Sequence, residues 1–294
     1  MEYLITKDFS GQTIKEFLRS NNVSAGLLKK LKKIENGITV NGEHQNVTYR
    51  LVENDILRLF IADLDSDTNE YLEPVDLPID IIFEDENITV VNKPSGMPTH
   101  QSLNNHGNTL ANALKYRYRD KPYVFRATNR LDKDTSGVVI TANNRYYSSL
   151  ISQMIKKNEI KKEYIAIVNG RLEGEGVIDA PIERVGESII KRIVRQDGER
   201  AVTQYRSLLS SDEISVLCVT PITGRTHQIR VHMAHIGHPI IGDGLYFEKS
   251  EHIARQALHC LKMDLGKYGC YKAPLPEDMV KLIRRYFENE EGLF

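Results

Sequence analysis

The most informative stretch of this chain reads Asn129-Arg130-Leu131-Asp132-Lys133-Asp134-Thr135-Ser136-Gly137. It places the carboxylate of Asp132 directly after an arginine and just before a turn-forming Thr-Ser-Gly run. A carboxylate that only caps a helix requires neither neighbour. A carboxylate that must stay ionised beside a polyanionic substrate benefits from an arginine close by. On this stretch alone, a capping aspartate in a solvated loop and a functional site are equally good interpretations.

A second block, roughly ninety residues further along, favours the functional interpretation. It reads Pro221-Ile222-Thr223-Gly224-Arg225-Thr226-His227-Gln228-Ile229-Arg230-Val231-His232. Shorter segments stand before, between and after the two blocks: Val90 to His100, Lys162 to Gly170, Gly237 to Asp243, and Arg255 to His259.

Taken together and in this order, these segments resemble the RluA family of RNA pseudouridine synthases. The resemblance extends over about residues 80 to 275. It implies an enzyme that isomerises uridine in RNA by breaking the bond from ribose to a base nitrogen and remaking it to a base carbon. In one place the chain departs from the family, which usually has His before Arg-Leu-Asp where this chain has Asn129.

The resemblance also implies the roles of individual residues. Asp132 is the catalytic carboxylate, and it attacks the anomeric carbon, adds to the pyrimidine ring or takes a proton from the ribose. Arg225 is the arginine expected to pair with it, and Tyr164 is expected to stack on the target base. Arg130 is a candidate for filling the place of the flipped uridine. Further candidates for contacts with substrate are Asn129, Lys93, His227 and Arg230.

Each of these residues also has a plainer interpretation. Tyr164 alternates with Ala166 and Val168 on one face of a predicted strand, where a core aromatic is common. Outside its motif, Arg225 reads as a helix-start residue bound to a loop carbonyl. The presence of Asp132, Tyr164 and Arg225 together favours a synthase over an RNA-binding protein without catalysis.

Histidines suggest a third possibility, a metallohydrolase. His232, His235 and His238 are spaced by three residues, with His227 and Asp243 not far away. A straight helix spreads residues with this spacing around its axis instead of making them converge. Neither Glu nor Cys accompanies them, so we expect neither a metal site nor any other cofactor.

Composition limits the class of protein. The chain has 294 residues, of which 40% are hydrophobic and 27% charged, and this is ordinary for one large or two smaller globular domains. No apolar run approaches the roughly 18 residues of a membrane helix. The three cysteines are scattered, which fits a reducing cytoplasm better than a disulfide framework. We therefore expect a cytoplasmic protein with no membrane partner and no obligate protein partner.

Charge is distributed unevenly, although the net charge is only -1. The segment from Asp63 to Glu86 contains no Lys or Arg, which is typical of a solvated linker. Basic residues gather elsewhere, at Lys29–Lys33, between Lys115 and Arg130, at Lys156–Lys162 and between Lys191 and Arg200. Several basic clusters around a nucleotide-like site indicate a path for RNA, either ribosomal or transfer RNA.

Three regions follow from these patterns. Residues 1–62 combine two short amphipathic helices, a basic second helix and a hairpin. They resemble a small α/β RNA-binding domain named for a ribosomal small-subunit protein. Residues 63–78 form an acidic linker, and residues 79–294 form the catalytic domain.

The predicted fold class is α+β, because hairpin-like strands and separate helices do not follow a repeating βαβ pattern. The resemblance implies an extended, mostly antiparallel mixed sheet with flanking helices and a central cleft. Strands are predicted at 79–82, 88–91, 137–141, 163–168, 202–208 and 214–220. Helices are predicted at about 109–117, 145–156, 225–236 and 276–287.

Overall fold

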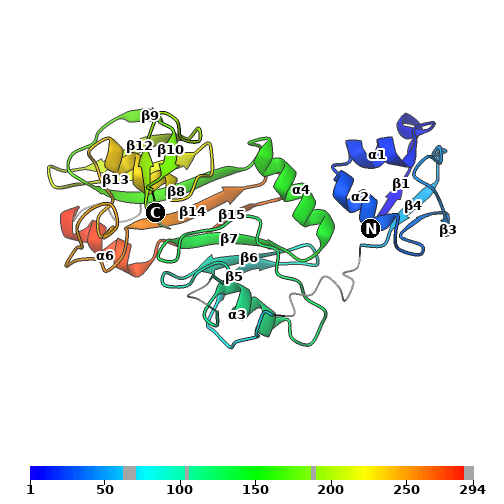
Figure 1. Ribbon diagram of the computed structural model, residues 1–294, viewed down its shortest axis with the longest axis horizontal. Helices are drawn as coiled ribbons and strands as arrows, with labels where there is room; N and C mark the ends of the chain where they lie inside the picture. Colours follow the sequence, from blue (N-terminus) through cyan, green and yellow to red (C-terminus); the bar gives the residue numbers. More distant parts are fainter. Residues whose placement is uncertain (62–70, 103–105, 187–189, 288–294) are drawn as a thin grey trace.

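A computed structural model describes residues 1–61, 71–102, 106–186 and 190–287 of the chain. It contains a small N-terminal sheet and a nine-stranded central sheet with helices around it (Figure 1). The predicted α+β class is therefore confirmed. The first half of the predicted acidic linker, residues 63–70, lies outside the described residues.

The N-terminal sheet has the strand order β1-β4-β2-β3 and carries two short helices. Its elements are β1 (Glu2–Leu4), η1 (Lys7–Phe9), α1 (Ile14–Ser20), α2 (Ala25–Leu31), β2 (Ile38–Val40), β3 (Glu43–His44) and β4 (Ile56–Leu59). Thr13 and Ser24 cap the two helices through their hydroxyl groups. The apolar residues of both helices are buried, and they belong to one hydrophobic cluster that extends into the central sheet.

The central sheet has the order β5-β6-β7-β14-β8-β13-β12-β9, and β15 pairs with β14. Its strands are β5 (Asp80–Glu84), β6 (Ile88–Lys93), β7 (Ser136–Ala142), β8 (Lys161–Asn169), β9 (Glu175–Asp179), β12 (Val202–Ser210), β13 (Ile214–Pro221), β14 (Leu258–Asp264) and β15 (Cys270–Lys272). The pair β7–β14 is parallel and the other described pairs are antiparallel. A separate hairpin joins β10 (Ile182–Arg184) to β11 (Arg192–Val194).

Helices cover the sheet and its ends: α3 (Leu110–Arg117), α4 (Arg145–Lys156), α5 (Gln228–His235), η3 (Gly266–Tyr268) and α6 (Glu277–Tyr286). Helix α4 lies between the central sheet and the N-terminal unit (Figure 1). There, the Tyr146 hydroxyl donates to the carbonyl of Asn21 at 3.1 Å, and the Gln153 amide donates to that of Asn22 at 2.9 Å. Asn21 and Asn22 of the N-terminal unit are thus bonded to helix α4.

The predicted helices and the six predicted strands are all present, with shifted ends. The third helix begins at Gln228 instead of residue 225, because His227 adopts a left-handed backbone with φ of 57°. Strand β14 was not predicted, although Arg255 to His259 was recognised as a motif. Among the described residues, no helix combines the length and apolar character needed to span a bilayer.

Candidate active site

Buried side chains hold the loop that carries Asp132 in place. The hydroxyl of Thr99 donates to the carbonyl of Leu131 and accepts from its amide, at 3.1 and 3.2 Å. The ammonium of Lys93 donates to the carbonyl of Lys133 at 3.1 Å, next to Asp132 in sequence. These bonds fix the backbone on both sides of the carboxylate before β7 begins.

The prediction that Lys93 contacts substrate phosphate or ribose is wrong. Lys93 is fully buried, and its ammonium also donates to the carbonyls of Pro94 and Met97 at 2.8 and 2.7 Å. Burial lowers the pKa of Lys93 to about 7, against the opposing effect of Asp134 and Asp132. Its role is to hold the loop, since three carbonyls already occupy its three donor hydrogens.

The facing wall of the site is the turn from β13 into α5, which is organised by Gln228. Its side-chain oxygen accepts from the hydroxyl of Thr223 at 2.6 Å and from the amide of Arg225 at 3.0 Å. Its side-chain nitrogen donates to the carbonyl of Val202 at 2.9 Å and to Thr203. This buried amide therefore ties the turn to β12 and sets the position at which α5 starts.

The carboxylate of Asp132 is paired with Arg230. Arg230 Nη1 lies 3.0 Å from Asp132 Oδ2, and its Nε and Nη2 each donate at 2.7 Å to the carboxylate of Asp243. Asp243 is completely buried and the side chain of Arg230 is only 7% exposed, whereas that of Asp132 is 21% exposed. The two-pronged bond to Asp243 orients the guanidinium, which then holds one oxygen of Asp132.

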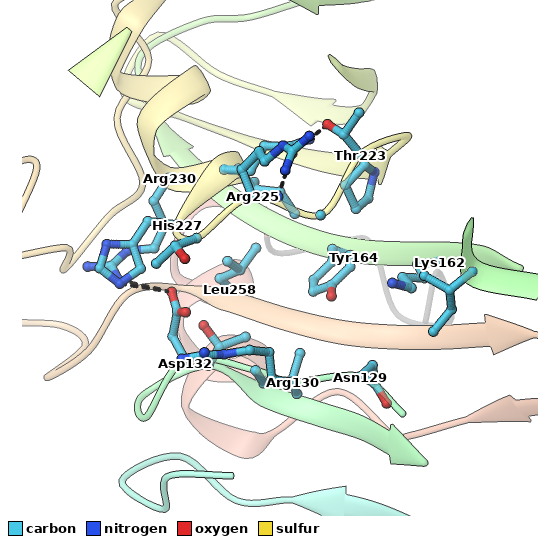
Figure 2. A pocket seen from close by; sticks show the side chains of 18 of the residues that line it. Asn129, Arg130, Asp132, Lys162, Tyr164, Thr223, Arg225, His227, Arg230 and Leu258 are labelled. Carbon is cyan, nitrogen blue, oxygen red and sulfur yellow. Dashed lines mark hydrogen bonds and ion pairs between the residues drawn. The ribbon is translucent and has the colours of Figure 1, made fainter. Parts of the chain in front are cut away.

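The prediction that Arg225 pairs with Asp132 is therefore wrong. Arg225 Nε donates to the carbonyl of Arg200 at 3.1 Å, and its Nη1 forms an ion pair with Glu199 at 3.1 Å. Figure 2 shows Arg225 beside Thr223, across the cavity from Asp132. The plainer interpretation of Arg225, a residue bound to a loop carbonyl, describes its contacts.

His227 was predicted to contact substrate, and in the structure it lies beside the carboxylate of Asp132. Its Nε2 is 3.7 Å from Asp132 Oδ2, and its Nδ1 is 2.9 Å from the hydroxyl of Tyr246. Burial lowers the pKa of His227, an effect that Asp132 opposes. The imidazole is therefore neutral near pH 7, between the carboxylate and Tyr246.

Tyr164 forms part of a cavity of about 270 Å³ between these two walls. Lys162 and Leu258 also line it, and Figure 2 shows Tyr164 between Asp132 on one side and Lys162 on the other. Burial raises the pKa of Tyr164 well above its usual value, and Cys260 adds to the effect, so its hydroxyl stays protonated. The cavity presents an aromatic ring next to a carboxylate.

Asn129 and Arg130 differ in their roles. The side chain of Asn129 donates to the carbonyl of Val138 at 3.1 Å and accepts from the amide of Ile140 at 2.9 Å. It thereby pairs with β7 like a short piece of strand, although it also lines the cavity. Arg130 is exposed and lies in the wall of the cavity.

The histidines that suggested a metallohydrolase have other partners. His232 is fully buried, with Nδ1 2.8 Å from the Thr203 hydroxyl and Nε2 2.9 Å from the carbonyl of Ala180. His238 Nδ1 lies 3.0 Å from the carbonyl of Asn169, outside α5. Both ring nitrogens of His232 are committed to packing the helix against β12, so the observed geometry does not support a metal site built on it.

Three residues of the site were not identified from the sequence: Asp243, Tyr246 and Lys162. All three stand in or beside segments whose motifs were recognised, Gly237 to Asp243 and Lys162 to Gly170. The neighbouring Gly242 is the feature of the sequence that could have pointed to Asp243, because it marks a turn. Gly242 has φ of +75°, and a Cβ there would collide with the carbonyl of Arg255, so the backbone turns sharply at this point.

Comparisons with known proteins show which family the chain resembles. The family model described as RNA pseudouridylate synthase matches residues 87–235. The chain is 37% identical to an uncharacterized RNA pseudouridine synthase of Bacillus subtilis, YjbO, over 92% of this chain and 98% of that protein. It is also 37% identical to the ribosomal large subunit pseudouridine synthase D of Escherichia coli, covering 72% and 71% of the two chains. The solved structure of human RNA pseudouridylate synthase domain containing 4 has a TM-score of 0.60 and 25% identity, covering 70% and 92%.

Proposed function

Because the chain belongs to the RNA pseudouridylate synthase family, we propose that its substrate is a folded ribosomal or transfer RNA and that Asp132 is its catalytic carboxylate. The reaction breaks the bond from C1′ to N1 of a uridine and forms a bond from C1′ to C5. The proton on C5 leaves and N1 acquires one, so no atom is gained or lost. Uridine isomerisation of this kind needs no redox partner.

The observation that carries the proposal is the ion pair of Asp132 with Arg230 at 3.0 Å, at the wall of the cavity that contains Tyr164. Arg230 occupies one carboxylate oxygen and orients the carboxylate, and both attack and proton removal require this group. A pyrimidine stacked on Tyr164 gains roughly 1–3 kcal/mol, which offsets part of the cost of flipping the nucleotide.

We propose further that the exposed basic residues form the RNA path into the cavity. Arg130 and Arg225 lie at opposite walls of the cavity (Figure 2). Arg130 would fill the space of the flipped base, because a planar guanidinium stacks and also binds phosphate. The N-terminal unit carries Lys29, Lys32 and Lys33 on and just after α2, all exposed, and we assign it the role of an RNA clamp.

Large-subunit ribosomal RNA is the first substrate to test, because of the similarity to the Escherichia coli protein named for that subunit. We propose a cytoplasmic location for the same reason, and the three free cysteines fit a reducing compartment. The test maps pseudouridine in total RNA from cells with and without the gene, and in RNA from the deficient cells treated with pure protein. We expect sites that vanish with the gene and return with the protein. Identical maps in all samples would refute the proposal.

A further inference from the structure

One hydroxyl group connects three parts of the active site. The hydroxyl oxygen of Tyr246 accepts from the backbone amide of Arg192 in β11 at 3.0 Å. The same oxygen lies 2.9 Å from Nδ1 of His227. The guanidinium of Arg230 lies over the aromatic ring of Tyr246, with 5.0 Å between Arg230 Cζ and the centre of the ring. Tyr246 therefore contacts both groups that face the carboxylate of Asp132, and it also contacts the β10–β11 hairpin.

The direction of the bond between Tyr246 and His227 depends on the tautomer of His227, and the need of the hydroxyl hydrogen for an acceptor favours donation by Tyr246. A phenol has one hydrogen, and burial raises the pKa of Tyr246, so the hydroxyl keeps that hydrogen. The oxygen already accepts from the Arg192 amide. Among the described residues, Nδ1 of His227 is the acceptor within reach of the hydroxyl hydrogen. Nδ1 must then be unprotonated, and in a neutral imidazole the hydrogen lies on Nε2.

Nε2 is the nitrogen that faces Asp132. The distance of 3.7 Å to Oδ2 is longer than a hydrogen bond, so the N–H points at the carboxylate without binding its oxygen tightly. The charged groups around His227 are Asp132, Asp243, Arg230 and Arg192, two of each sign, and they leave burial as the dominant influence. The left-handed backbone of His227 is needed to aim the ring in this direction, and such strain is typical of functional positions.

We propose that Tyr246 is a positioning residue for this synthase: it fixes His227 as a neutral Nε2–H donor directed at the catalytic carboxylate, and it supports Arg230 from below. Asp132 then faces one full positive charge, that of Arg230, and one weaker dipole. A protonated His227 would add a second full charge and weaken the carboxylate as nucleophile or base. The proposal deepens the proposed function, on which its catalytic consequence rests.

Tyr246 and Asp243 belong to the same short turn of the chain. The backbone amides of Tyr246 and Phe247 both donate to the carbonyl of Asp243, at 3.1 and 2.7 Å. Asp243 and Tyr246 lie three residues apart, and both contact the guanidinium of Arg230: Asp243 through its carboxylate and Tyr246 through its ring. One short turn thus orients both His227 and Arg230.

The direct test is nitrogen-15 NMR of the histidine side chains in the full-length protein, with His227→Asn used to identify the His227 signals. Asn tolerates the left-handed backbone at this position better than most residues. In the parent protein we expect the neutral ring of His227 to carry its proton on Nε2. A proton on Nδ1 would overturn the proposal. This measurement requires no substrate, so it stands apart from any failure of the proposed function.

The second test compares Tyr246→Phe with Tyr205→Phe, which removes a phenol far from Asp132 on β12. In Tyr246→Phe the neutral form of His227 loses its hydrogen-bond donor, so we expect His227 to become protonated at a higher pH. We expect kcat to fall on the order of 10-fold below pH 7, less at pH 8, with KM nearly unchanged. An unaltered His227 titration together with a pH–rate profile like that of Tyr205→Phe would refute the positioning role.

Discussion

At the scale of single residues, the carboxylate of Asp132 offers the sharpest test. Asp132→Asn keeps the size of the side chain and removes its charge and nucleophilicity. We expect the variant to fold and to bind RNA at least as well as the parent, because one negative charge facing phosphate is gone. Turnover should fall below detection, as an amide neither attacks carbon nor takes a proton.

The measurement is mass spectrometry of nucleosides released from a treated transcript. Asp134→Asn is the matched control, since it removes a neighbouring carboxylate two residues away and should leave turnover within a few-fold. Substantial pseudouridine from Asp132→Asn would remove Asp132 from the mechanism.

The two arginines of the second motif should also differ in effect. Arg230→Lys keeps the charge but cannot reach two oxygens of Asp243 and one of Asp132 together, so we expect kcat to fall about 10²–10³-fold. Arg225→Lys or Arg225→Gln alters a half-exposed ion pair with Glu199, so KM should rise while kcat changes little. Steady-state kinetics on one transcript decides the matter. Equal losses of kcat would mean that Arg225, too, acts on the reacting atoms.

The sequence could not decide between these arginines, although it identified both. They stand five residues apart in one motif, and either can reach Asp132 if the helix starts at a suitable residue. The choice depends on the left-handed His227, which delays the start of α5 to Gln228 and turns Arg230 toward the carboxylate. Asp243 and Tyr246, which complete the arrangement, come from a turn brought into place by tertiary packing.

At the scale of structural elements, the loop before β7 depends on the buried ammonium of Lys93. Burial lowers the pKa of Lys93 to about 7 in the folded protein, against about 10.4 when unfolded. Between these values the unfolded chain binds the additional proton, so the contribution of Lys93 to stability rises with pH from about 7 to about 10. Below pH 7 this contribution is at its lowest and constant.

Urea denaturation of the parent and of Lys93→Gln between pH 6.5 and 9.5 tests this dependence. The glutamine variant should be less stable, by roughly 2–4 kcal/mol, because it leaves buried carbonyls unpaired. The difference between the two proteins should grow as pH rises. Parallel curves would show that Lys93 keeps the same charge in both states.

Elements with regular patterns were predictable, and those defined by distant partners were not. The alternation or continuous apolar runs of β6, β7, β8 and β13 made these strands predictable, and helical spacing of apolar residues did the same for α1 and α2. Strand β14 has no such pattern, because it is buried between β7 and β8 and interrupted by Lys262. The β10–β11 hairpin is short and polar, and its position near the site follows from its bond to Tyr246.

At the scale of the whole molecule, the basic residues of α2 lie at one end and those of α6 at the other (Figure 1). If the N-terminal unit is an RNA clamp, replacing Lys29, Lys32 and Lys33 with Gln should weaken RNA binding. The slope of log affinity against log salt should fall by about 0.7–0.9 for each lost phosphate contact. The matched control replaces Lys281, Arg284 and Arg285 of α6, which are equally exposed. An unchanged slope for the α2 variant would make this helix a solvated surface only.

The position of β14 in the sheet has a consequence for biosynthesis. Strands β5, β6 and β7 lie on one side of it, and β8, β13, β12 and β9 lie on the other. A ribosome that has made the chain as far as Arg255 has supplied Asp132, Tyr164 and Arg230, but the two half-sheets still have no strand between them. The nascent enzyme therefore cannot assemble its cavity until residues 258–264 have emerged. Until then the facing edges of β7 and β8 remain open to pairing with another chain, and the insertion of β14 between them ends that exposure at the same time as it completes the active site.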